Sequence, residues 1–85
     1  MKLQKAIHDA YQNLKSSNIK SALLDSELLM ANVLNESREH IVLNLNKEIA
    51  KKDYDNFQNI VHQRSKGKPI AYLMNKKFFG NMNFM

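Results

Sequence analysis

The side chains that most often carry chemistry are few in this 85-residue chain and lie far apart along it. The three histidines, His8, His40 and His62, show neither the His-x-x-x-His nor the Glu-x-x-His spacing that places two metal ligands on one helix face. The absence of cysteine excludes disulfides, thiolate ligands and thiol nucleophiles. The two glycines, Gly67 and Gly80, cannot form a glycine-rich phosphate loop. We therefore expect no catalytic residue, no cofactor-binding residue and no metal ligand.

The acidic residues do not change this expectation. Asp25 and Glu27 offer two carboxylates close together in the chain, as general acid–base catalysis requires. On a helix, however, side chains two positions apart point about 160° away from each other, so the two cannot share a substrate. Glu36 and His40 are four residues apart and are expected to form a surface pair.

The excess positive charge is concentrated in the last third of the chain. The net charge is +5, but residues 1–55 contain eight acidic and eight basic residues and so balance. Residues 56–85 contain no acid and five bases: Arg64, Lys66, Lys68, Lys76 and Lys77. Such a segment attracts an anionic partner, either nucleic acid or an acidic protein surface. The alternative is a solvated lysine-rich tail. If there is a partner, we expect the four lysines to contact it and Arg64 to face inward.

Aromatic side chains interleave with these bases at Tyr72, Phe78 and Phe79. A mixture of cations and rings can contact phosphates and stack on bases, which keeps an RNA-binding helical module among the alternatives. No helix-turn-helix, KH or RRM signature accompanies it, and the rings are equally suited to packing against protein.

Helical periodicity runs through most of the chain and predicts an all-α fold, a small bundle of four to five helices. The first helix has one apolar face in 4-3-4 spacing, formed by Leu3, Ile7, Ala10 and Leu14. Polar residues 16–18 end it. Ser21 and Ser37 are expected N-caps, and Asn35 is the expected left-handed end of the second helix. Further helices are predicted over residues 37–45, 50–66 and 69–74.

The junction between the last two helices has a clear signature. Gly67 supplies the left-handed residue that closes a helix, and Pro69 suits the first position of the next one.

Two charges fall inside predicted apolar faces. Placed at about 100° per residue, Glu27 lies within the face of Leu23, Leu24, Leu28, Met30, Ala31 and Leu34, while Asp25 lies outside it. Arg64 lies between Phe57 and Ile60 on the inner face of the fourth helix. Because a lone buried charge costs several kcal/mol, about as much as breaking a buried pair, we hypothesise that Glu27 and Arg64 pair. The alternative is that both extend to water from the edges of their faces.

The last eleven residues differ from the rest. Residues 78–84 partly alternate and contain a Gly-Asn turn signal, so they predict a strand or one arm of a hairpin. A single hairpin arm is marginal in water, which suggests that the chain is a fragment. No apolar run approaches the ~20 residues that span a bilayer, and the first residues do not resemble a signal peptide. We expect a cytoplasmic protein.

Two segments resemble a known family. The first contains Asp25-Ser26-Glu27-Leu28-Leu29, and the second is Arg64-Ser65-Lys66-Gly67-Lys68-Pro69-Ile70-Ala71-Tyr72-Leu73, followed six residues later by Phe79. They are similar to the D-A-E-x-L-L and R-x-x-G-x-P-[IL]-[AQ]-[YH]-[IL]-x-G-x-x-x-F patterns of the HemK/PrmC family, the protein-(glutamine-N5) methyltransferases of peptide chain release factors. Ser26 replaces the usual alanine, and Asn75 replaces a glycine, where asparagine still tolerates a left-handed turn.

The resemblance implies a division of labour. Residues 1–74 would form a helical N-terminal, substrate-recognition domain, and residues 75–85 a truncated linker toward the protein's own C-terminal catalytic domain. That domain would bind S-adenosylmethionine and carry the Asn-Pro-Pro-Tyr motif, which this chain lacks. The fragment would help recognise or position a class I release factor, whose Gly-Gly-Gln glutamine is methylated. Alternatives are a ribosomal-protein glutamine methyltransferase paralogue and a purely structural cap for the catalytic domain.

Overall fold

In the computed structural model, which describes residues 1–74, these residues form five helices. The bounds are Leu3–Ser16 for α1, Ala22–Leu34 for α2, Arg38–Leu43 for α3, Lys51–Ser65 for α4 and Ile70–Met74 for α5. No strand occurs among them, and the predicted all-α fold is confirmed. The strand or hairpin arm predicted after Asn75, and with it Phe79, Lys76 and Lys77, lies outside the described residues.

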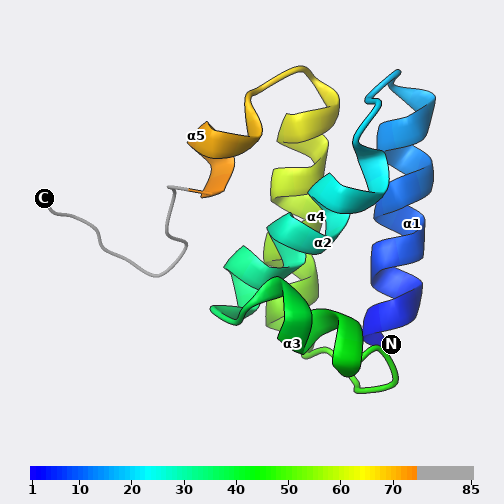
Figure 1. Cartoon of the computed structure of the whole chain (residues 1–85), viewed down its shortest axis with the longest axis vertical. Coiled ribbons are helices and arrows are strands. Elements are labelled where there is room, and N and C mark those ends of the chain that lie inside the picture. The colour runs from blue at the N-terminus through cyan, green and yellow to red at the C-terminus, as the bar shows by residue number, and fades with distance from the viewer. Residues whose placement is uncertain (75–85) are drawn as a thin grey trace, which may run out of the picture.

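The helices form a bundle in which α1, α2 and α4 pack against one another, as Figure 1 shows. α2 contacts all four other helices, with α3 at one end of the bundle and α5 beside α2 and α4. α1 and α4 run in one direction, and α2 runs back obliquely across the bundle, in front of α4 in this view. As a result, the α1–α2 turn and the α4–α5 turn lie at the same end of the bundle, although nearly fifty residues separate them in the chain.

The core is built from the faces predicted for α1 and α4. All four apolar residues predicted for α1 are buried, together with Ala6, and Phe57, Ile60 and Val61 of α4 are fully buried. Burial of a side chain of this size stabilises the fold by about 1.5–3 kcal/mol. In these two helices polar residues occupy the remaining positions, so the period of 3.6 identifies the buried face correctly.

The face predicted for α2 is only partly correct, since Met30 and Ala31 are the members of it that are buried. Leu23 and Leu24 are 50% and 44% exposed, whereas Asp25 and Ser26 are buried. The buried positions include Ala22, Asp25, Ser26, Leu29 and Met30, which follow the spacing of a helix face but mix polar with apolar residues. Leucines occur on every side of this helix, so hydrophobicity alone does not distinguish its inner face. The Ser26 hydroxyl donates to the Ala22 carbonyl at 2.7 Å, which satisfies it inside the core.

The helix ends confirm most of the predicted caps. The Ser37 hydroxyl accepts the His40 N–H at 3.1 Å, and Asn35 has a φ of 57°. Ser21 precedes α2 but makes no side-chain cap, which corrects its predicted role. α3 ends at Leu43, earlier than predicted, where the Asn44 side-chain amide donates to the His40 carbonyl.

The start of α1 is held by a distant segment. The Leu3 and Gln4 N–H groups, which have no partner within the helix, donate to the Lys47 and Leu45 carbonyls at 2.8 and 2.9 Å. Ile49 in turn donates to the Met1 carbonyl at 2.9 Å. These bonds tie the α3–α4 connection to the lower end of the bundle in Figure 1.

Candidate functional site

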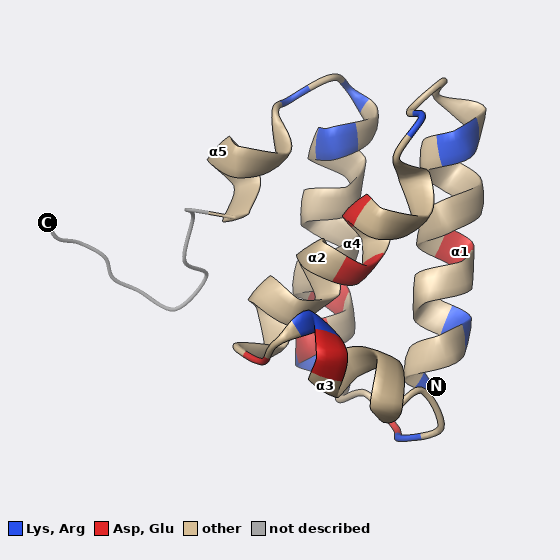
Figure 2. Cartoon of the chain, in the orientation of Figure 1, with Lys and Arg blue, Asp and Glu red and all other residues tan. Residues whose placement is uncertain are grey.

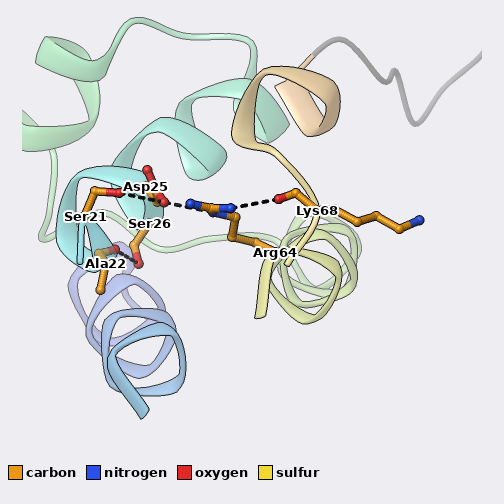
Figure 3. Close-up of polar contacts among 6 residues, drawn as sticks. All are labelled: Ser21, Ala22, Asp25, Ser26, Arg64 and Lys68. Atoms are coloured by element: carbon orange, nitrogen blue, oxygen red, sulfur yellow. Dashed lines mark hydrogen bonds and ion pairs between the residues drawn. The ribbon is translucent and has the colours of Figure 1, made fainter. Parts of the chain in front are cut away.

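An arginine bridge joins α2, α4 and the turn that leads to α5. The Arg64 Nε donates to the Asp25 carboxylate at 2.9 Å, and its Nη1 donates to the Lys68 carbonyl at 2.9 Å (Figure 3). The Ser21 hydroxyl donates to the same Asp25 oxygen at 3.0 Å. The Asp25 side chain is 4% exposed and that of Arg64 is 19% exposed. A planar guanidinium can bind a carboxylate and a carbonyl at the same time because its N–H donors are fixed in one plane.

The predicted partner of Arg64 is therefore wrong, while its inward direction is confirmed. Glu27 instead accepts from Arg38 Nε at 2.8 Å, in a pair between α2 and α3 at the surface. The reason is the orientation of α2, which turns Asp25 toward α4 and Glu27 toward α3. The sequence does contain a signal for this orientation of α2, the helical spacing of Ala22, Asp25, Ser26 and Leu29. The leucines at 23, 24 and 28 form a second, more apolar face that competes with it.

The turn after α4 has the predicted backbone. Gly67 has a φ of +100°, a conformation that side chains rarely adopt, and its N–H donates to the Arg64 carbonyl at 2.9 Å. Pro69 directly precedes α5, and its carbonyl accepts the Leu73 N–H at 3.2 Å. α5 thus begins one residue later than predicted, at Ile70. Pro69 is its N-cap residue, whose carbonyl accepts the first hydrogen bond of the helix.

Two of the four predicted partner-binding lysines fall on this turn. Lys66 and Lys68 are exposed, and Lys68 Nζ lies 5.6 Å from the centre of the Tyr72 ring. Figure 3 shows the Lys68 side chain pointing away from the arginine bridge, while its carbonyl belongs to the bridge. Tyr72 is 49% exposed beside it. Lys76 and Lys77 remain predictions.

The sequence analysis missed two further lysines at this end of the bundle. Lys15 lies in the last turn of α1 and Lys20 in the α1–α2 turn, both exposed and at the same end of the bundle as Lys66 and Lys68. Figure 2 shows basic residues on both turns at this end. Counting charge along the chain placed these two lysines in the balanced half, and only the fold reveals the grouping.

Among residues 1–74, no group of three His, Asp or Glu side chains could hold a metal ion. His40 Nδ1 lies 3.9 Å from the Glu36 carboxylate, which confirms the predicted surface pair. Within residues 1–74 no helix is long and apolar enough to cross a membrane. What this end of the bundle offers is a rigid turn with exposed cations, an arrangement suited to binding.

The comparisons with known proteins agree with the patterns in the sequence. The chain matches the PrmC N-terminal domain over residues 5–74. It is 35% identical to a release factor glutamine methyltransferase of Leptospira interrogans over 71 residues, which is 84% of this chain and 25% of that protein. A protein of the same name from Buchnera aphidicola is 32% identical over 69 residues, 81% of this chain and 25% of its own length.

A bifunctional methyltransferase of Rickettsia felis is 25% identical over 83 residues, 98% of this chain and 16% of that protein. No solved structure matches the chain significantly. The chain spans about a quarter of the length of the first two relatives.

Proposed function

The chain belongs to the PrmC N-terminal domain family, and from this premise we propose that it recognises and positions a class I release factor for glutamine methylation. The relatives named release factor glutamine methyltransferase support this choice of substrate. The observation that carries the proposal is the family match over residues 5–74, which includes the arginine bridge and the turn with Lys66 and Lys68.

The proposal assigns the chemistry to another part of a longer protein. S-adenosylmethionine would supply the methyl group in a catalytic domain. The residues described here do not fit that cofactor, because they contain no glycine-rich loop and Gly67 faces open space. This chain would contribute by holding the release factor, since positioning a reactant lowers the barrier without any reacting group. The cytoplasm, where translation takes place, is the proposed location.

Lys66 and Lys68 are the proposed contacts within the described residues. Both ammonium groups are exposed, and the backbone that carries them is fixed by Gly67 and by the bond from Arg64 to the Lys68 carbonyl. A cation on a rigid turn loses little backbone freedom on binding. A complementary acidic surface would be attracted and oriented by such charges.

The test is titration of the ¹⁵N-labelled chain with a class I release factor, followed by NMR. We expect shifts at the α4–α5 turn, and we expect the Lys66→Gln/Lys68→Gln variant to bind about fivefold to tenfold more weakly. The Lys47→Gln/Lys52→Gln variant removes the same charge at the opposite end and should bind like the wild type. Shifts with tRNA but none with the release factor would overturn the proposal in favour of an RNA-binding module.

A further inference from the structure

The end of the bundle that carries Lys66 and Lys68 holds two more cations from a distant part of the chain. We use the name cationic end for the four lysines of the two turns, Lys15, Lys20, Lys66 and Lys68. The parallel course of α1 and α4 places both turns there (Figure 1), and Figure 2 shows basic residues on each. Charges that are divided between two segments in the sequence therefore act on one surface.

These four ammonium groups are not neutralised within the described residues. None lies within 4.0 Å of a carboxylate of residues 1–74, whereas Lys5 and Lys51 on other parts of the surface pair with Asp9 and Asp55. Asp25, in the first turn of α2 at this end, is buried and already paired with Arg64. A cluster of like charges without counter-charges produces a positive potential that an anionic partner can neutralise.

The α1–α2 turn adds a hollow to this surface. The hollow has a volume of about 400 Å³ and is lined by Tyr11, Lys15, Asn18, Ile19, Lys20 and Ala22. Lys15 Nζ lies 5.6 Å from the centre of the Tyr11 ring, so one cation stands over the aromatic wall. Tyr11, Ile19 and Ala22 give the hollow an apolar side, and the two lysines give it a cationic one.

The chemistry favours an acidic polypeptide over a nucleic acid. Both arginines of the chain hold an internal carboxylate, Arg38 that of Glu27 and Arg64 that of Asp25, so the four exposed cations of this end are lysines, which lack the planar fork that contacts phosphate or guanine in a bidentate manner. Leu23 and Leu24, exposed in the first turn of α2, adjoin the turn that carries the lysines. Apolar side chains bordered by charges are typical of protein interfaces.

We infer that the cationic end and the hollow of the α1–α2 turn form one docking surface for an acidic, amphipathic segment of a protein partner. An apolar side chain of that segment occupies the hollow, and carboxylates on either side of it face the lysines of both turns. The inference rests on the proposed function for the identity of the partner, the release factor, and adds Lys15, Lys20 and the hollow to its binding site.

The test is the Lys15→Gln/Lys20→Gln variant of the chain, titrated with a class I release factor at several salt concentrations. We expect affinity to fall about fivefold to tenfold and the salt dependence to become weaker, because two of the attracting charges are lost. The matched control, Lys47→Gln/Lys52→Gln, carries the same change in net charge at the opposite end. Amide shifts in the wild-type chain should include residues 11–22. Thermal unfolding of each variant checks that the fold is kept.

The outcomes separate this inference from the proposed function. If the release factor binds the wild type and the Lys15→Gln/Lys20→Gln variant equally, the docking surface is refuted and the proposed function stands. If both double variants lose the same affinity, only overall charge matters, and the docking surface is refuted. If the release factor does not bind the wild type, or if tRNA binds this surface and the release factor does not, both are refuted.

Discussion

The ion pair between Asp25 and Arg64 should show a larger coupling energy in a double-mutant cycle than the second carboxylate–arginine pair of α2. This helix carries two carboxylate–arginine pairs of nearly equal length, Asp25–Arg64 at 2.9 Å and Glu27–Arg38 at 2.8 Å, both through the arginine Nε. They differ in burial mainly on the arginine side: Arg64 is 19% exposed and Arg38 is 48% exposed, while their carboxylate partners Asp25 and Glu27 are 4% and 13% exposed. The second pair is therefore a natural control for the first, in the same helix and with the same chemistry.

The substitution Arg64→Met removes the guanidinium and leaves the carboxylate of Asp25 buried. Loss of one partner of a fully buried ion pair costs about 3–5 kcal/mol. Here the Ser21 hydroxyl still donates to Asp25, and Arg64 is partly exposed, so we expect a smaller loss of about 2–3 kcal/mol. A chain of 85 residues has roughly 4–13 kcal/mol of stability in total, so the loss is large but measurable.

The coupling energy isolates the interaction itself. Asp25→Asn keeps the shape and removes the charge, and the cycle with Arg64→Met should give a coupling of about 1–2 kcal/mol. The Glu27→Gln/Arg38→Met cycle should give about 0.2–1 kcal/mol, as exposed pairs do. Arg64→Lys is the milder variant if Arg64→Met unfolds the chain, because an ammonium cannot donate in a fixed fork to both Asp25 and the Lys68 carbonyl.

The assay is urea unfolding followed by circular dichroism, with free energies of unfolding extrapolated to water. A coupling energy for Asp25 and Arg64 no larger than that for Glu27 and Arg38 would refute the reasoning, because burial would then have no effect on the strength of the pair. Amide shifts of residues 68–74 report on the second contact of Arg64. If they do not move in Arg64→Met, the bond to the Lys68 carbonyl does not orient α5.

Two further predictions concern the turn after α4 and the lower end of the bundle. Gly67→Ala should lower the free energy of unfolding by about 1–2 kcal/mol, measured by urea unfolding, because of the φ of +100° alone: outside the two neighbouring residues, no atom lies within 4 Å of the added Cβ. Gly67→Asn should cost less, and equal losses would contradict a backbone cause. At the other end, a hydrogen bond and the attraction of the N-terminal ammonium, 2.8 Å away, lower the pKa of Glu48. Its contribution to stability is present above the pKa of the unfolded carboxyl and is lost as the pH falls through the lower, folded-state pKa. The urea midpoint of Glu48→Gln should therefore approach that of the wild type at acidic pH, and a constant difference from pH 7 to pH 3 would be evidence against this pair.

The sequence predicts those parts of the fold in which polar and apolar residues are segregated. In α1 and α4 one face is apolar and the rest polar, so the buried positions follow from the period of the helix. The turn signals at Asn35, Ser37 and Gly67 act locally and are predicted equally well. In α2 leucines surround the helix, and its orientation is decided by partners on other elements, Arg64 for Asp25 and Arg38 for Glu27.

The candidate site is predictable only in part for the same reason. Lys66 and Lys68 stand out because residues 56–85 contain no acid. Lys15 and Lys20 are hidden among the balanced charges of residues 1–55, since proximity between the two turns arises only when α1 and α4 pack in parallel. Charge counted along a chain differs from charge on a surface whenever the fold places distant turns at the same end.

Lys68 contributes to the stability of the fold through its backbone and to the proposed binding surface through its side chain. Its carbonyl accepts from Arg64 and belongs to the bridge, while its side chain points away from the bridge into the cationic end (Figure 3). Because the carbonyl is present whatever the side chain, Lys68→Gln alters the surface charge and leaves the bridge intact. Arg64→Met lowers the net charge by the same amount, but at a mostly buried side chain, and it removes the hydrogen bond that holds the turn on which Lys66 and Lys68 lie. The two substitutions therefore separate the loss of a binding charge from the loss of the rigid turn that holds it in place.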